Sequence, residues 1–96
     1  MSKLSLIIPV YNEEKSLKTI VKRTLEIQKK LNDIKLELII VDDCSSDNSF
    51  NVAKELESEN IKIFRHEKNK GKGAALKTGF LQASGDYIGI QDADME

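Results

Sequence analysis

The fold is decided by two apolar stretches, residues 4–10 (LSLIIPV) and residues 36–41 (LELIIV). Both are nearly unbroken and rich in Ile, Leu and Val, which is typical of parallel strands that are covered on both faces. Two shorter apolar runs follow at residues 61–64 (IKIF) and 87–90 (YIGI). The sequence therefore predicts four strands.

Segments with a helical repeat of apolar residues separate the four runs. The first helix is expected to begin at Asn12 as its N-cap, with Glu13 in the first turn, where the helix dipole favours acids. The second is expected to open at Ser45 or Ser46, and the third around Gly73. The residues expected to be buried on these helices are Leu17, Ile20, Val21 and Leu25, then Phe50, Ala53 and Leu56, then Ala75, Leu76, Phe80 and Ala83.

The order β-α-β-α-β-α-β predicts an α/β fold. We expect a Rossmann-like parallel sheet with helices on both faces, formed by residues 1–96 as a single domain. Ligands of such sheets bind at the carboxyl ends of the strands. Acidic and polar clusters follow three of the four runs, at residues 9–13, 42–47 and 91–96. These clusters are the candidate site.

Composition excludes several classes of function. The 15 basic and 16 acidic residues nearly balance, so no strong field would recruit nucleic acid. Cys44 is the only cysteine, which excludes an intrachain disulfide framework. No run approaches the ~20 apolar residues of a membrane span, and no signal peptide is recognised. We expect a cytoplasmic protein whose membrane attachment, if it has one, lies outside this chain.

Two carboxylates, Asp92 and Asp94, close the fourth run. At a strand end, two Asp side chains one residue apart can point toward one divalent cation, and hard oxygen ligands suit Mg²⁺ or Mn²⁺. Such a metal would bridge a diphosphate and neutralise it as it leaves. The alternative is a solvated turn, but the position at the ligand-binding edge of the sheet favours the metal.

Asp42 and Asp43 end the second run. Burying two adjacent carboxylates without partners is costly, and strand alternation predicts that one of them faces the cleft. A carboxylate there can accept hydrogen bonds from uracil or guanine. Helix capping is the alternative, because Ser45, Ser46 and Asp47 are good N-terminal residues. Ligand contact by Asp42 and capping by Asp43 both stay open.

Two further segments each allow two interpretations. Glu13 can accept hydrogen bonds from ribose hydroxyls, or serve as a first-turn acid, or both. Gly71, Lys72 and Gly73 open the third helix, where glycines let the backbone approach a phosphate. A helix-opening turn with solvated lysines is favoured over direct phosphate contact there. His66, the only histidine, is interpreted as a loop or strand-end residue, not as a catalytic base.

Four motifs in this order and spacing resemble the family 2 glycosyltransferases of the GT-A fold. They are residues 6–13 (LIIPVYNE), 40–47 (IVDDCSSD), 69–75 (NKGKGAA) and 92–94 (DAD). The sequence is most similar to the polyprenyl- and dolichyl-phosphate mannosyl- and glucosyltransferases, on GKGAALKTG at 71–79, ASGDY at 83–87 and DADME at 92–96. The family usually has Gly at the position of Cys44, although Cys also occurs there.

The resemblance implies roles for individual residues. The nucleoside pocket would be lined by Pro9, Tyr11 and Glu13, with Asp42 on the base. The diphosphate and sugar end of the donor would be bound by Lys72, Asp92 and Asp94. The metal, Mg²⁺ or Mn²⁺, would be ligated by Asp94, with Glu96 and Asp92 as further ligands.

The same resemblance implies inverting transfer of a hexose from a UDP- or GDP-sugar, with a polyprenyl phosphate as a candidate acceptor. A whole domain of this family is longer than 96 residues, so we expect the acceptor pocket and any catalytic base to lie outside this chain. No catalytic residue is assigned within it. We expect the isolated chain to bind donor weakly, to transfer nothing, and to self-associate through the unpaired edge of its last strand.

Two rival functions are considered. A response-regulator receiver shares the fold class, and residues 39–43 (IIVDD) resemble its acidic strand end. The receiver's acidic pair follows the first strand, however, and here it follows the second. The other rival is a non-catalytic fragment that binds nucleotide or serves as an assembly unit. Metal-dependent donor binding would distinguish a functional half-site from an inert fragment.

Overall fold

The computed structural model describes residues 2–93 of the 96-residue chain. Strands and helices alternate along the whole described range. Their bounds are β1 Ser2–Val10, α1 Leu17–Lys30, β2 Ile34–Asp42, α2 Ser49–Leu56, β3 Ile61–Arg65, α3 Lys72–Gln82 and β4 Tyr87–Ile90. All four predicted strands are present, and none of the helices within residues 2–93 is long and apolar enough to cross a membrane.

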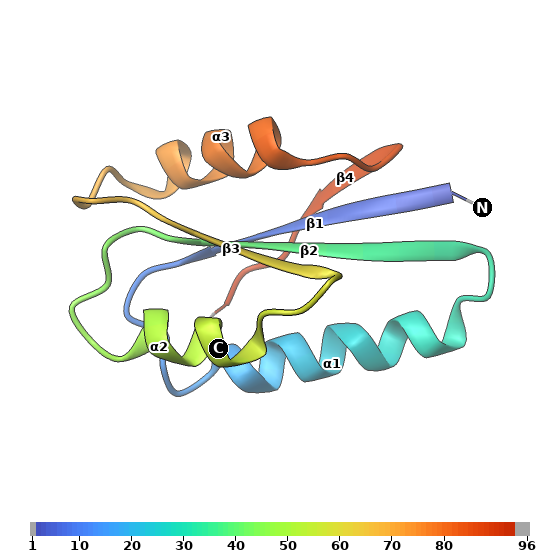
Figure 1. Ribbon diagram of the computed structural model, residues 1–96, viewed down its shortest axis with the longest axis horizontal. Coiled ribbons are helices and arrows are strands. Elements are labelled where there is room, and N and C mark those ends of the chain that lie inside the picture. The colour runs from blue at the N-terminus through green and yellow to red at the C-terminus, as the bar shows by residue number, and fades with distance from the viewer. Residues whose placement is uncertain (1, 94–96) are drawn as a thin grey trace.

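The four strands form one parallel sheet in the order β3-β2-β1-β4. Helices α1 and α2 cover one face and α3 covers the other (Figure 1). This confirms the predicted α/β fold with helices on both faces. From β1 the chain builds outward to β2 and β3, and then returns to place β4 on the other side of β1. Such a reversal of strand order opens a crevice at the carboxyl ends of the central strands.

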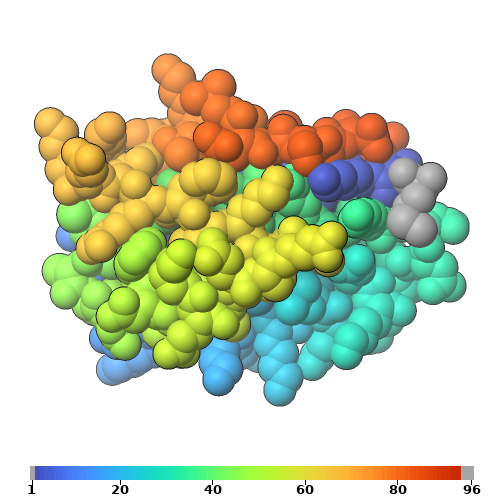
Figure 2. All heavy atoms as spheres, viewed as in Figure 1, coloured from blue at the N-terminus to red at the C-terminus, as the bar shows by residue number. Residues whose placement is uncertain are grey.

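Alternate residues of β2 face opposite helical layers. Leu38 and Ile40 belong to the larger core, which includes residues of α1 and α2, whereas Ile39 and Val41 pack with Ala75 of α3. Figure 2 shows the outer edge of the sheet, where the yellow β3 segment lies at the surface between α2 and α3. Both faces of the two central strands are thus buried, which explains why their sequences are almost continuously apolar.

The helix starts differ from those predicted. Helix α1 begins at Leu17, and its N-cap position is Ser16, not Asn12. Helix α2 begins at Ser49, three to four residues later than expected, and α3 begins at Lys72. Asn12 adopts a left-handed conformation with φ of 55° and sits in the preceding loop. Asn12 and Ser45, which were expected at helix starts, instead accept backbone N–H groups from each other's loops.

The buried sides of the helices are mostly as predicted. Leu17, Ile20, Val21, Ala53 and Ala75 are buried. Others of the predicted set are only half-buried: Leu25, Phe50, Leu56, Leu76 and Ala83. Phe80 was expected in the core but is 46% exposed, because α3 turns Ala75 and Gly79 toward the sheet.

A buried carboxylate, Glu37 of β2, holds the amino ends of the strands together. Its oxygens accept hydrogen bonds from Ser5 Oγ at 2.6 Å and from the backbone N–H of Ser84 at 3.1 Å, and Lys62 Nζ lies at 2.9 Å. Burial raises the pKa of Glu37, but the Ser5, Lys62 and Ser84 contacts outweigh it and hold the pKa at about 2. Because Ser84 precedes β4, this network fixes β4 beside β1.

Candidate functional site

A cavity of about 420 Å³ opens at the carboxyl ends of β1, β2 and β4. Its walls come from the strand ends, the connection between β3 and α3, and the start of α3. The lining residues are Pro9, Val10, Tyr11, Glu13, Asp43, Asn69, Gly71, Lys72, Ala75, Asp92 and Ala93. The cavity therefore lies at the reversal of strand order, where parallel sheets bind ligands.

Most of the described residues that the sequence nominated lie together on this cavity. The ones that line it are Pro9, Tyr11, Glu13, Lys72 and Asp92. Asp42 is not among the lining residues. The predicted roles of Asp94 and Glu96 fall outside the described residues.

Asp42 lies beneath the site and supports a turn. Its side chain has no exposed surface and accepts hydrogen bonds from Ser45 Oγ at 2.5 Å and from the Ser45 backbone N–H at 3.1 Å. Arg65 Nε approaches the same carboxylate at 3.6 Å, and its guanidinium stacks over Phe50 at 4.6 Å from the ring centroid. Strand alternation explains this placement, since Asp42 shares the face of Leu38 and Ile40, which α1 and α2 cover.

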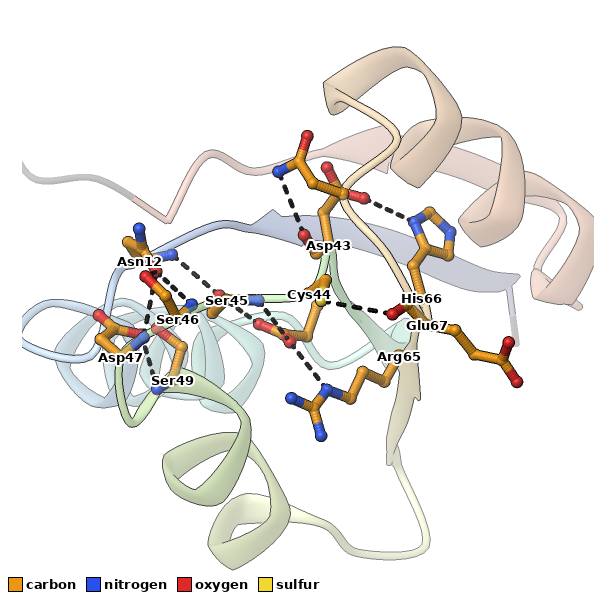
Figure 3. A network of polar contacts seen from close by, with 12 residues as sticks. Asn12, Asp43, Cys44, Ser45, Ser46, Asp47, Ser49, Arg65, His66 and Glu67 are labelled. Carbon is orange, nitrogen blue, oxygen red and sulfur yellow. Dashed lines mark hydrogen bonds and ion pairs between the residues drawn. The ribbon is translucent and has the colours of Figure 1, made fainter.

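Asp43 is the acid that reaches the cavity, on the face that α3 covers. It accepts hydrogen bonds from the backbone N–H groups of Lys70 at 2.8 Å and Gly71 at 2.7 Å. It also contacts His66 Nδ1 at 2.7 Å (Figure 3). Burial raises the pKa of Asp43, but the His66 contact and the two amide bonds outweigh it and lower the pKa. Asp43 does serve a turn, but it is the turn before α3.

Reciprocal hydrogen bonds between two loops position Tyr11 and Glu13. The Asn12 N–H donates to Ser45 Oγ at 2.9 Å, and the Glu13 N–H donates to the buried Ser49 Oγ at 2.7 Å. Asn12 Oδ1 in return accepts the Ser46 N–H at 2.8 Å (Figure 3). The loop after β1 is therefore held by side chains that follow β2.

A further residue of this network, Asp47, carries its own stabilised charge. It accepts the Ser49 N–H at 2.9 Å and the Glu14 N–H at 3.3 Å. Burial raises the pKa of Asp47, but the Ser49 and Glu14 hydrogen bonds outweigh it and lower the pKa. The ionised form of Asp47 therefore stabilises the contact between the two loops.

On the opposite wall, Lys72 and Asp92 form an ion pair. Lys72 Nζ lies 2.7 Å from Asp92 Oδ1, and the two side chains are 61% and 55% exposed. A cationic and an anionic group therefore meet at the mouth of the cavity, beside the first turn of α3. This placement suits an anionic ligand and a cation together.

Comparison with known proteins identifies the chain. The sequence profile described as glycosyl transferase family 2 matches residues 5–96. The chain belongs to glycosyl transferase family 2. Membership of this family excludes the response-regulator receiver, which was considered because residues 39–43 resemble its acidic strand end.

Curated relatives of this family 2 chain include polyprenyl-phosphate sugar transferases. It is 40% identical over 99 residues to the undecaprenyl-phosphate 4-deoxy-4-formamido-L-arabinose transferase of Proteus mirabilis, covering all of this chain and 30% of the relative. It is 39% identical over 95 residues to the dolichol-phosphate mannosyltransferase of Pyrococcus furiosus, covering 98% of this chain and 26% of the relative. The predicted similarity to this subgroup is confirmed, and the chain spans less than a third of these relatives.

Solved structures agree with this family 2 assignment. A mannosyltransferase from Pyrobaculum calidifontis, solved in complex with GDP-Man and Mn²⁺, superimposes with a TM-score of 0.83 at 28% identity. The match covers 95% of this chain and 27% of that one. The GT-A fold expected from the resemblance is confirmed.

Of the predicted metal ligands, the structure describes Asp92, and its chemistry suits the metal that the family implies. Asp92 offers hard carboxylate oxygens at the cavity mouth and already faces the cationic Lys72. Within residues 2–93, no group of three His, Cys, Asp or Glu side chains could hold a metal ion. Asp92 alone does not complete a site, and the other predicted ligands, Asp94 and Glu96, lie outside the described residues.

Proposed function

We propose that the cavity binds the nucleoside-diphosphate part of a UDP- or GDP-sugar, as the donor-binding part of an inverting hexosyltransferase. One observation carries the proposal. A single cavity at the strand-order reversal brings together Pro9, Tyr11, Glu13, Lys72 and Asp92, which were nominated from separate motifs. Family 2 membership and the GDP-Man complex of the Pyrobaculum calidifontis relative support it.

The two sides of the cavity suit the two parts of such a ligand. Pro9 and Tyr11 offer apolar surface to a base, and Glu13 offers a carboxylate to ribose hydroxyls. Across the cavity, Lys72 and the amino end of α3 favour the negative charge of a diphosphate. The base contact predicted for Asp42 stays a prediction, and its buried position makes support of the Ser45 turn its role in this structure.

We further propose that Mg²⁺ or Mn²⁺ binds with the donor. Asp92 would contribute to its coordination, together with the predicted ligands Asp94 and Glu96. When bound, the metal supplies positive charge that stabilises the departing nucleoside diphosphate. Lys72, which pairs with Asp92 here, would contact the diphosphate beside this metal.

The acceptor is proposed to be a polyprenyl phosphate. The names of the Proteus mirabilis and Pyrococcus furiosus relatives support this, since each specifies a polyprenyl-type phosphate. A phosphate oxygen is already ionised, so its attack needs no general base. We assign donor binding, and no catalytic residue, to this chain. A lipid acceptor would place the reaction at a membrane surface, and the cytoplasmic location stays a prediction.

Isothermal titration of the chain tests donor binding. UDP, GDP, UDP-glucose and GDP-mannose would each be titrated with and without Mn²⁺. We expect metal-dependent binding of one nucleotide class, weakened at least about tenfold by Asp92→Asn. Asp33→Asn, the same change in the exposed turn before β2, is the matched control and should leave binding unchanged. A folded chain that binds none of the four compounds would overturn the proposal.

A second role, self-association, is favoured by the edge strand β4. Within the described residues β4 pairs only with β1, and its side chains Tyr87, Ile88 and Ile90 are 45–65% exposed. An exposed apolar edge invites pairing with a second copy of the chain. Sedimentation velocity should show a dimer whose dissociation increases in Ile88→Lys. A monomer at every concentration reached would refute this role.

A further inference from the structure

His66 is buried between the end of β2 and helix α3. It directly follows the end of β3, in agreement with its interpretation as a loop or strand-end residue, and its side chain is 8% exposed. Nδ1 lies 2.7 Å from Asp43 Oδ1, and Nε2 lies 2.8 Å from Thr78 Oγ1 on α3. Figure 3 shows the ring directed at Asp43. Both ring nitrogens are therefore engaged, and the ring bridges two elements that form the cavity.

The Asp43 carboxylate connects His66 to the backbone at the rim of the cavity. Oδ1 also accepts the Lys70 N–H at 2.8 Å, and Oδ2 accepts the Gly71 N–H at 2.7 Å. Gly71 is the N-cap residue of α3, and its carbonyl accepts the Ala75 N–H at 3.1 Å. The orientation of the Asp43 carboxylate therefore determines the positions of Lys70 and Gly71, the two residues before Lys72.

Hydrogen-bond chemistry determines which ring nitrogen carries a proton. The lowered pKa of Asp43 means an ionised carboxylate that only accepts, so Nδ1 must donate. In the neutral ring Nε2 then accepts from the Thr78 hydroxyl, and in the protonated ring it donates to the same oxygen. Because a hydroxyl can reverse its role, Asp43 faces an N–H in either state of the ring.

We propose that His66 is a positioning residue of the donor cavity, whose Nδ1–H fixes the Asp43 carboxylate and thereby the Lys70–Gly71 backbone at the cavity rim. The ligand side of this inference rests on the proposed donor site. The structural side does not, since the hydrogen bonds to Lys70 and Gly71 exist without any ligand. The alternative role is space filling, in which the ring matters only for its bulk.

Two variants separate the roles of the two ring nitrogens. In His66→Asn, Nδ2 lies as many bonds from Cβ as Nδ1 of histidine, so a donor to Asp43 is retained and the Thr78 contact is lost. In His66→Gln, Nε2 corresponds to Nε2 of histidine, so the Thr78 contact is retained and the donor to Asp43 is lost. Both replace the ring by a smaller neutral amide. In the proposed role the two variants differ because only His66→Asn keeps an N–H group that faces Asp43.

Amide hydrogen exchange, followed by NMR on the chain, is the direct readout. We expect His66→Gln to accelerate exchange at the Lys70 and Gly71 amides about tenfold or more, and His66→Asn to leave both within about threefold of wild type. Nitrogen-15 spectra of wild type should show the Nδ1–H tautomer in the neutral ring. Affinity for UDP and GDP in the presence of Mn²⁺ should follow the same order, with Gln weaker than Asn.

Each outcome decides the inference. Equal acceleration in both variants would reduce His66 to a packing residue, and no acceleration in either would remove it from the network; both overturn the proposal. Selective acceleration in His66→Gln supports it. If wild type binds neither nucleotide while the selective acceleration is present, the donor site fails and the positioning of the rim by His66 stands.

Discussion

Replacing Glu37 by glutamine should show how much the buried carboxylate stabilises the sheet. Its pKa falls from an ordinary 4.5 to about 2, because the Ser5, Lys62 and Ser84 contacts favour the ionised form more than burial opposes it. That displacement corresponds to about 3 kcal/mol of folding free energy at neutral pH. Glutamine resembles the protonated side chain in shape, so Glu37→Gln should lower the unfolding free energy at pH 7 by about 3 kcal/mol.

The pH dependence of this effect has a definite sign. A folded-state pKa below the unfolded value gives stability that is complete above pH 4.5 and is lost as the pH falls toward 2. About 2 kcal/mol of it should be gone by pH 3. Urea unfolding of wild type and Glu37→Gln at pH 7, 5, 4 and 3 would measure the difference, which should shrink steadily with acid.

The control is Glu55→Gln on the exposed side of α2, which makes the same chemical change on an exposed residue. It should shift the unfolding free energy by less than about 0.5 kcal/mol at every pH. A Glu37→Gln difference that stays constant between pH 7 and pH 3 would refute the reasoning, since a constant loss reflects packing and not ionisation.

Three further predictions concern backbone and packing. Gly79→Ala should cost about 1–3 kcal/mol in urea unfolding, although alanine favours helices, because the added Cβ would overlap Ile7 Cγ2 in the core; a stabilised variant would contradict this. Gly71→Ala should cost about 1–3 kcal/mol, since φ of 96° and ψ of 164° are essentially open to glycine alone; an unchanged melting temperature would count against it. Ser49→Ala should cost about 1–3 kcal/mol of unfolding free energy, because it leaves the Glu13 N–H without its acceptor. Ser49→Thr keeps a hydroxyl acceptor and should lose less; an equal loss in both variants would contradict this explanation.

The two central strands, β1 and β2, were predictable from the sequence because both of their faces are covered and their side chains are therefore almost continuously apolar. The β4 bounds, Tyr87–Ile90, match the predicted run, and β2 extends it by two residues at its start and one at its end. Parallel strands between two helical layers need apolar side chains at successive positions, and few other structures do. The order of the runs then restricted the topology to a right-handed parallel sheet.

The helix starts and the choice between the two acids were less predictable. Asn12 fits an N-cap by local rules, but its side chain bonds to the backbone of Ser46, 34 residues away. Alternation predicted that one of Asp42 and Asp43 faces the cleft, and only the position of α3 decides that it is Asp43. His66 gave no local signal, because its two partners become neighbours only in the folded chain.

The position of β1 in the centre of the sheet has a consequence for the order of folding. Its partner β2 follows within about thirty residues, whereas β4, which pairs with Leu4–Ile7, follows only after about eighty residues. Closing so long a loop costs more entropy, and distant contacts form more slowly. On the ribosome, the β1-α1-β2-α2-β3 segment can assemble while one edge of β1 is still unpaired. The nascent chain therefore carries an open, apolar strand edge until Tyr87–Ile90 emerges, and this interval is when it most needs a chaperone.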